Sequence, residues 1–560
     1  MNTPMPMSQI RKMSVLLLLP ALACAQLAKV SDDKNILGHP LAFDEQRRVL
    51  PWYQPETPGA AYDHVVRLAS GFLLHHAPVE PKTGLPMYLV TSSFSKPDLK
   101  GTTYQAETWA SNPACIFAGS VQSFAVGYYG YTGDGAAIEV VRGMLDYQLA
   151  HGTTPPDFHW PAVPYASADP FVKDYQGSAL WASEGMRGDG LEGIEPDKVG
   201  ELGYGYVRFF EITGERKYLE AALHCADALA AHVRDTNPEP GPFIAAAVEK
   251  SPWPFRINAR TGTVISEYCS NVLDPVRLFD EVSRISDRIA LEPARREKYQ
   301  RARDLAWRWL FSRNGPMKTF IWNAYFEDIP NDPGRSNRLQ VTPLELAKYL
   351  VRHPELDKNV DGDVSALIRW VATAFKADGW DGINEQTWCY EPMGSHTSRY
   401  GAACALFYER TGDAHYKDQA YRFLNYATYM TLEDGFVAVG PNWPGAWWSD
   451  GYSDYVRHFL DALGAIPEWA PAGENHLLKS SSVVQKISYA RNEISLTTYD
   501  ASPDLVFRLA QVPAHVLAGD KPLLMPGDGA DTWTWKPLGA GGILRLHGAP
   551  GNAFTIRFKP

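Results

Sequence analysis

The chain has few cysteines, and their spacing gives them no shared role. Six cysteines occur in 560 residues, and the five that follow Cys24 are an odd number without a C-x-x-C pair. This pattern argues against a disulfide framework and a zinc cluster, while one disulfide bridge stays open. We therefore predict no metal site and no other cofactor. The five are Cys115, Cys225, Cys269, Cys389 and Cys404.

Long apolar runs and charged tails are also missing. Beyond the first 25 residues no stretch reaches the roughly 18 consecutive apolar residues of a membrane-spanning helix, so no span is predicted. The 53 basic and 64 acidic side chains are spread along the chain, with a net charge of -11, so nucleic acid is not predicted as a partner. Phosphate loops, dinucleotide fingerprints, G-x-S-x-G elbows and zincin helices are absent, which argues against nucleotide and serine esterase chemistry.

The one short apolar run of interest lies at the beginning of the chain. Arg11 and Lys12 precede the run Val15 to Leu19, and Ala23-Cys24-Ala25 follows before Gln26. A charged segment, a short apolar segment and an A-x-A site are typical of an export signal. We predict that residues 1–25 are a signal peptide and that the protein is periplasmic or secreted. Because Ala21 to Cys24 loosely matches a lipobox, anchoring through an acylated Cys24 is the alternative.

Three short motifs at the ends of helical stretches indicate a repeated hairpin. Tyr131 to Asp134, Glu211 to Glu215 and Glu409 to Asp413 each follow an aromatic-rich stretch and precede another helical pattern. The last two share the pattern E-x-T-G-[DE], and Glu195-Pro196 and Glu391-Pro392 open the segments before them. Proline just inside a helix start and glycine just past its end are the expected punctuation. One helical hairpin is therefore used repeatedly.

Hydrophobic periodicity predicts twelve helices, which would pair into six hairpins. Such hairpins stack into a solenoid or close into a ring, and the unequal spacing of the three motifs favours a ring. The ring is predicted over residues 55–470, after a lead segment over residues 26–54. The predicted helices span 61–76, 117–131, 136–150, 197–212, 216–233, 272–285, 295–312, 342–352, 364–376, 395–410, 414–429 and 452–464.

After Pro467 the pattern changes to short runs with a period of two. Ile494, Leu496 and Thr498 alternate with their neighbours, and clusters such as Pro526-Gly527-Asp528-Gly529 separate the runs. These features predict a small antiparallel β-sandwich over residues 475–560. Its predicted strands span 483–489, 494–499, 505–509, 543–546 and 554–558.

The chain resembles the (α/α)6 toroid superfamily, the six-hairpin glycosidase-like glycoside hydrolases and polysaccharide lyases. The resemblance rests on the E-x-T-G-[DE] closures, on the tryptophan-rich loop Gly440 to Trp448 and on the terminal β-sandwich. It implies a mainly α fold, a toroid followed by a β-sandwich, and an enzyme that acts on an oligo- or polysaccharide. The 17 Trp, 28 Tyr and 23 Phe fit platforms for sugar rings as well as a bulky core.

Two loops carry carboxylates suited to sugar hydrolysis, which needs one protonated and one ionised carboxyl group. Asp189 and Glu192 lie in the glycine-rich segment Glu184 to Glu195, directly before a helix. Asp450 follows two tryptophans and precedes the last helix of the ring, where capping that helix is its alternative role. We predict a glycoside hydrolase with these three acids as catalytic candidates. Predicted sugar contacts come from Trp388, Trp443, Trp447, Trp448 and Tyr452.

A third loop supports an alternative, a polysaccharide lyase acting on a uronate-containing glycan by β-elimination. His396, Arg399 and Tyr400 stand at i, i+3 and i+4, so on a helix they share one face. Toroid lyases use a His or Tyr base, a Tyr acid and an Arg or Asn that neutralises the uronate, and by resemblance this trio and Asn271 are candidates. A structural role for a His near a helix start is the simpler interpretation. A second alternative is a non-catalytic glycan-binding protein with a tryptophan-lined cleft.

Overall fold

The computed structural model describes residues 29–180, 189–236, 250–313, 315–323, 337–387, 389–443, 445–525 and 532–559. The predicted signal peptide, Cys24 and Trp388 lie outside these ranges. Within them, no helix combines the length and the apolarity needed to cross a membrane.

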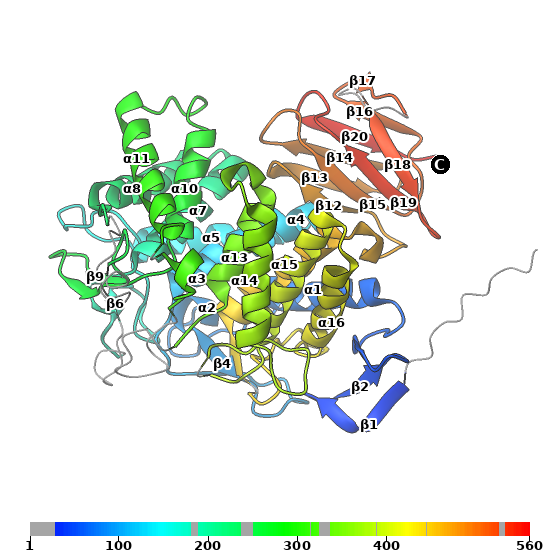
Figure 1. Cartoon of the computed structure of the whole chain (residues 1–560), viewed down its shortest axis with the longest axis horizontal. Helices are drawn as coiled ribbons and strands as arrows, with labels where there is room; N and C mark the ends of the chain where they lie inside the picture. Colours follow the sequence, from blue (N-terminus) through cyan, green and yellow to red (C-terminus); the bar gives the residue numbers. More distant parts are fainter. Residues whose placement is uncertain are drawn as a thin grey trace, which may run out of the picture.

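Twelve helices of the described chain alternate between an outer and an inner layer (Figure 1). The last inner helix packs back against the first, so the inner layer closes into a ring. All twelve predicted helices are confirmed, and the fold is the predicted (α/α)6 toroid. The outer helices are α1 (Pro58–His75), α5 (Ala136–His151), α8 (Arg216–His232), α11 (Pro293–Leu310), α14 (Val360–Ala374) and α16 (Ala414–Thr428). The inner helices are α3 (Pro113–Ser120), α7 (Pro196–Thr213), α10 (Leu273–Arg284), α13 (Val341–Arg352), α15 (Gly394–Thr411) and α17 (Tyr455–Ala465).

Two inner helices are extended by π-helical turns. After α3 the chain continues through η1 (Val121–Tyr128) into α4 (Tyr129–Thr132), and η3 (Trp448–Asp454) precedes α17. η1 and η3 face one another, and Ser453 of η3 donates to the carbonyl of Ile116 over 2.8 Å. π-Helical turns are rare and frequently occur at functional sites. Shorter helices in the loops are α2 (Met87–Val90), α12 (Pro316–Thr319), η2 (Pro354–Leu356) and η4 (Pro467–Trp469).

The ends of the helices show why the sequence divides where it does. Gly133, Gly214 and Gly412 close α4, α7 and α15 with φ of 77°, 75° and 73°, a left-handed conformation that glycine adopts without strain. Proline stands in the first turn of α1, α3, α7 and α11, where its missing N–H leaves no helical bond unmade. The predicted helical hairpins therefore begin and end at these residues.

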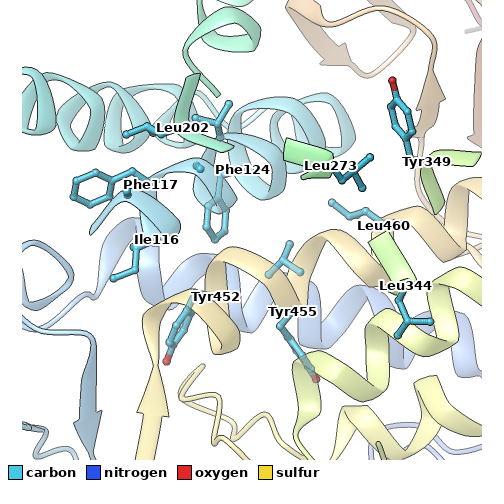
Figure 2. Packing of buried hydrophobic residues seen from close by; sticks show 14 of the residues in the cluster. Ile116, Phe117, Phe124, Leu202, Leu273, Leu344, Tyr349, Tyr452, Tyr455 and Leu460 are labelled. Carbon is cyan, nitrogen blue, oxygen red and sulfur yellow. The ribbon is translucent and has the colours of Figure 1, made fainter. Parts of the chain in front are cut away.

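The apolar core lies between the inner helices and the outer layer. Figure 2 shows Phe124 of η1, Leu202 of α7, Leu273 of α10, Leu344 of α13 and Leu460 of α17 in one cluster, although they are far apart in the sequence. All five are buried. Full burial of one such side chain contributes roughly 1.5–3 kcal/mol, so many of them together hold the ring closed.

A β-sandwich follows the ring, as predicted. All five predicted strands are present, and four more come from short segments whose alternation is too brief to detect in the sequence. In β14, Ile494, Leu496 and Thr498 face the interior, which explains the period of two. One antiparallel sheet contains β12 (His476–Ser480), β15 (Leu505–Leu509), β19 (Gly542–Leu546) and β18 (Trp533–Pro537). The other contains β13 (Val484–Ala490), β14 (Glu493–Thr498), β20 (Ala553–Arg557), β16 (His515–Ala518) and β17 (Lys521–Pro522).

The sandwich covers the rim of the ring at which the inner helices end. Tyr489 donates to the carbonyl of Gly130 in α4 over 2.6 Å, and Gln485 donates to the carbonyl of Glu211 in α7 over 2.9 Å. Asp500 pairs with Arg284 at the end of α10 over 2.8 Å. Figure 1 shows this domain, in orange and red, on one side of the helices. The rim at which the inner helices begin is left for the loops between them.

Short sheets lie in the loops and at the beginning of the described chain. β1 (Lys29–Ile36), β2 (His39–Phe43) and β3 (Val49–Leu50) form a sheet that contacts α16, where Asn425 donates to the carbonyl of Val49 over 2.9 Å. The loop strands are β4 (Ser93–Ser95), β5 (Gln105–Ala106) and β11 (Gly445–Trp447) in one sheet, β8 (Gly193–Ile194), β9 (Arg256–Asn258) and β10 (Val264–Ser266) in another, and the pair β6 (Gly177–Ser178) and β7 (Gly190–Leu191).

The close approach of α7 and α10 gives a testable prediction. A Cβ atom at Gly200 would lie 2.4 Å from the backbone nitrogen of Pro275, so Gly200→Ala is expected to destabilise the fold by roughly 1–3 kcal/mol. Gly143 in α5 has open space around it, so Gly143→Ala should instead add about 0.5–1 kcal/mol through helix propensity. Denaturant unfolding measures both changes. Equal stabilities of the two variants would contradict the packing described for α7.

Candidate functional site

A pocket of about 200 Å³ lies where the six inner helices begin. Its lining includes Cys115 of α3, Lys198 of α7, Asp274 of α10, Thr342 of α13 and His396 of α15, and η3 completes it. Helix N-termini carry partial positive charge, so their convergence favours acidic side chains at this position. Eight acidic residues line the pocket, namely Asp189, Glu195, Glu201, Asp274, Glu345, Glu385, Asp450 and Asp454. Five cations accompany them, namely Lys198, Arg256, Arg277, Arg399 and Arg457.

The predicted candidate Asp189 is in the pocket, where a buried arginine holds it. Arg256 of β9 donates through Nε to Oδ1 of Asp189 over 2.8 Å and to Oε1 of Glu195 over 2.7 Å. The other carboxylate oxygen of Asp189, Oδ2, is buried and has no hydrogen-bond partner among the described residues. Burial and the neighbouring Asp189 raise the pKa of Glu195 well above its usual range. Asp189 is therefore a fully buried carboxylate with one oxygen that no described residue bonds.

Glu192, the second acid of the same loop, is not brought to the pocket. It lies at φ 59° in the turn between β7 and β8, and its carboxylate pairs with Arg260 over 2.7 Å. It does not line the cavity. Asp189 and Glu192 are only three residues apart, but the tight turn around Gly190 and Gly193 separates them. Asp189 lines the pocket, and Glu192 does not.

Asp450 is in the pocket on η3, which precedes the sixth inner helix, whereas the Asp189 loop precedes the second. Its carboxyl group accepts hydrogen bonds from Ser449 over 2.8 Å and from Ser395 over 3.3 Å. Burial raises the pKa of Asp450 above its usual value, although these hydroxyl groups and Arg399 work in the other direction. The N-cap residue of α17 is Asp454. The alternative prediction, that Asp450 caps this helix, is therefore wrong.

His396 lines the pocket as a neutral imidazole. Arg399 donates through Nη1 to Nδ1 of His396 over 2.9 Å, and Nε2 lies 3.9 Å from Oδ1 of Asp450. Burial, and then the charge of Arg399, lower the pKa of His396 well below its usual value. Because a guanidinium group only donates, Nδ1 is the acceptor and the proton is on Nε2. His396 thus presents an N–H group to the pocket.

The two remaining lyase candidates are separated by the structure. Asn271 lines the pocket, and its amide donates to Asp274 over 2.8 Å and to Asp197 over 3.2 Å. Tyr400 packs its ring against Phe423 at 4.5 Å between centroids and does not line the cavity. Tyr400 lies one turn further along α15 than His396, and its ring packs on the outer helix α16 and not on the pocket wall.

Sequence reasoning missed the buried acid Glu345 in α13. Its carboxylate pairs with Arg277 over 3.0 Å, Lys348 over 3.2 Å, Arg399 over 3.3 Å and Arg457 over 3.2 Å. Although burial alone would raise the pKa of Glu345, these four cations hold it well below its usual range. The signal in the sequence was an acid between two leucines in a mostly apolar helical segment, and Arg256 stands in a similar apolar run.

The adjacent acid Asp454, like Glu345, has several basic partners. It contacts Arg457 over 2.5 Å, His458 over 3.1 Å and also Arg399. Ligand atoms of His396, Asp450 and Asp454 lie within 4.8 Å of one another, the arrangement of a small metal site. Arg399 already bonds to two of these three side chains, so a metal ion there would compete with a resident cation.

The predicted aromatic contacts divide into pocket and core. Trp447 lines the pocket beside Trp109, with ring centroids 5.8 Å apart, and Trp443 meets Trp447 edge-on at 6.1 Å. Trp448 is buried and stacks on Phe94 at 4.4 Å, and the buried Tyr452 contacts the same core cluster. Adjacent residues of an extended segment point to opposite sides, which separates Trp447 from Trp448.

Comparison with known proteins identifies the fold. No family model and no curated protein sequence matches the chain. Among solved structures, a cellobiose 2-epimerase from Spirochaeta thermophila DSM 6192 is similar with a TM-score of 0.50 at 12% identity, over 74% of this chain and 98% of that one. A D-mannose isomerase reaches 0.48 at 12% identity, over 73% and 96%, and an unsaturated glucuronyl hydrolase specific for heparin reaches 0.42 at 10%, over 73% and 97%. The chain has the six-hairpin glycosidase-like fold, which confirms the predicted resemblance.

The two neighbouring tryptophans should respond differently to substitution. Trp448→Ala removes a fully buried ring and is expected to lose roughly 3–5 kcal/mol of unfolding free energy. Trp447→Ala should lose much less stability, and should weaken binding of a neutral oligosaccharide measured by calorimetry. Denaturant unfolding compares the two variants, and equal losses would contradict the placement of Trp447 at the pocket.

We expect that removing the partly buried carboxyl group of Asp450 raises the stability in a pH-dependent way. Because its pKa is raised on folding, the folded state binds more protons than the unfolded state between the two pKa values, and stability falls as the pH rises through that window. Asp450→Asn abolishes this titration, so its Tm should exceed that of the wild type increasingly as the pH rises above about 4.

Asp434 provides the opposite case as a control for that measurement. Although burial alone would raise it, the pKa of Asp434 is held below its usual value by Lys96 and Tyr104. Its contribution to stability is therefore present at neutral pH and lost as the pH falls. Asp434→Asn should lower the Tm at neutral pH and approach the wild type in acid. The same sign for both variants would overturn the assignment for Asp450.

Proposed function

We propose that the protein is an exported glycoside hydrolase that cleaves an oligo- or polysaccharide by carboxylate acid/base catalysis. The observation that carries the proposal is the pair of carboxyl groups in one pocket, Asp450 with a raised pKa and Asp189 with an unpartnered oxygen. Export rests on the pattern of residues 1–25 alone. The fold, in which solved structures of sugar-processing enzymes are found, agrees with a sugar ligand.

In this mechanism Asp450 is the general acid. A carboxyl group with a raised pKa is suited to donate its proton to the glycosidic oxygen as the bond to the anomeric carbon breaks. The side chain of Asp450 is 23% exposed, whereas Glu195 is almost fully buried and bonded to Arg256. Of these two carboxyl groups with a raised pKa, Asp450 is therefore the one that a substrate can reach.

Asp189 supplies the second carboxylate. The bond from Arg256 to Oδ1 orients it, and the buried Oδ2 has no hydrogen-bond partner among the described residues at this wall of the cavity. An oxygen in this position can take a proton from an attacking water or bond to the anomeric carbon, which are the two known routes of glycoside hydrolysis. Trp447 and Trp109 offer ring faces on which the apolar side of a pyranose packs.

The charge pattern favours a neutral sugar over a uronate. Each of the five pocket cations among the described residues has a carboxylate partner, as Lys198 does with Glu201 and Arg256 with Asp189. A uronate carboxylate would need a cation beyond these pairs. The lyase alternative also requires a lone pair at the base, and the Nε2 of His396 carries the proton. Tyr400, its candidate acid, does not line the pocket, which also favours the hydrolase.

Activity assays on variants test the proposal. Asp450→Asn and Asp189→Asn are each expected to lower kcat by roughly 10²–10⁴-fold, because a positioned acid or base contributes about that much. Glu192→Gln, in the same loop as Asp189 but paired with Arg260 outside the pocket, is the matched control and should retain wild-type kcat. New reducing ends released from neutral glycans measure the rate.

Other products would identify the alternatives. Ultraviolet absorbance of an unsaturated uronate released from a uronate polysaccharide would overturn the hydrolase in favour of the lyase. An isomerised sugar, seen by chromatography without new reducing ends, would point to epimerase or isomerase chemistry. Binding by calorimetry without any product would leave a non-catalytic glycan-binding protein.

A further inference from the structure

We propose that Glu345 is a positioning residue, which acts through Arg399 to hold His396 with its Nε2 proton directed toward Asp450. This inference rests on the proposed function in one respect, the role of Asp450 as the acid. His396 would then donate to a substrate oxygen bound beside that acid, and Glu345 would act on the reaction without touching the substrate.

The contacts of Arg399 set the tautomer of His396. Nη1 of Arg399 lies 2.9 Å from Nδ1 of His396, and Nε lies 3.3 Å from Oε1 of Glu345. Asp454 also pairs with this guanidinium group. An imidazole that accepts at Nδ1 must carry its proton on Nε2, provided the guanidinium group stays in place. The direction of the His396 donor therefore depends on what anchors Arg399.

Glu345 is the anchor shared by the surrounding cations. Besides Arg399 of α15 it bonds to Arg277 of α10, Lys348 of α13 and Arg457 at the beginning of α17. All five side chains are largely buried, so screening by water is weak. Without the carboxylate, four cations would repel one another, and Arg399 would lose one of its acidic partners while Asp454 remains. A shift of Arg399 would release Nδ1 of His396.

Glu345 is not suited to proton transfer itself. The surrounding cations hold its pKa well below the usual range, so it is ionised at neutral pH. Its two carboxylate oxygens are already engaged by four donors. A general acid needs a proton to give, and a general base needs an accessible lone pair. The role that remains for Glu345 is to orient the cations that it contacts.

The decisive measurement is the tautomer of His396 in 15N-histidine-labelled full-length protein. His396→Ala identifies its signals, and two-bond 15N correlations distinguish protonation at Nε2 from protonation at Nδ1. The wild type is expected to show the Nε2–H form. Glu345→Gln, and Arg399→Lys as a second variant should the first not fold, are expected to give mixed tautomers. Glu345→Asp, which keeps the charge, should restore the wild-type pattern.

The matched control is Glu211, a fully buried carboxylate of α7 at the opposite rim. It pairs with Arg208 over 2.8 Å and with Arg284, and it does not line the pocket. Glu211→Gln should lower the Tm as the loss of a buried ion pair does, while the signals of His396 and kcat stay unchanged. This control separates positioning from general destabilisation.

Kinetics add a second readout. Glu345→Gln is expected to lower kcat by about 10²-fold, with KM within a few-fold of the wild type, because the displaced donor acts in the transition state. A wild-type His396 protonated on Nδ1 or on both nitrogens would overturn the proposal, as would unchanged His396 signals in Glu345→Gln. Because the spectra need no substrate, they decide this proposal even if no glycan is hydrolysed, which would count against the proposed function alone.

Discussion

The pairing of Glu345 with four cations is the interaction on which the candidate site depends. It joins α10, α13, α15 and α17, which follow one another around the ring. Glu345 itself lines the pocket. Burying charges is costly unless every charge has a partner, and here each cation is shared with a second acid such as Asp274 or Asp454. The apolar core closes the ring, and this ionic layer fixes how the inner helices present their first turns to the pocket.

The two ends of the ring are chemically different. At one end the sandwich bonds to carbonyl groups of α4 and α7, so it covers the negative ends of the inner helices. At the other end the helix N-termini converge on a cavity rich in acids. The direction of the inner helices therefore favours the acids that line this cavity, and the sandwich leaves that rim to the loops.

The sequence predicted the loops that carry the site better than the residues within them. The Asp189 loop, the His396 segment and the Asp450 loop all reach the pocket. Glu192 and Tyr400 do not line it, and Trp448 and Tyr452 belong to the core. For Glu192 and Trp448, a residue of the same chemical type a few positions away, Asp189 or Trp447, lines the pocket instead. Composition and spacing place a loop at the rim, but the direction of one side chain depends on a turn such as Gly190 to Gly193.

The sequence by itself determined the twelve helices, their order as hairpins and the terminal sandwich. Hydrophobic period, proline at helix starts and left-handed glycine at helix ends act over a few residues, so they can be detected without the fold. Only the tertiary structure decided that Arg256 joins Asp189 to Glu195, that Glu345 collects four cations and that His396 carries its proton on Nε2. These contacts join residues up to more than a hundred positions apart, as Glu345 and Arg457 show, and no local pattern encodes such a pairing.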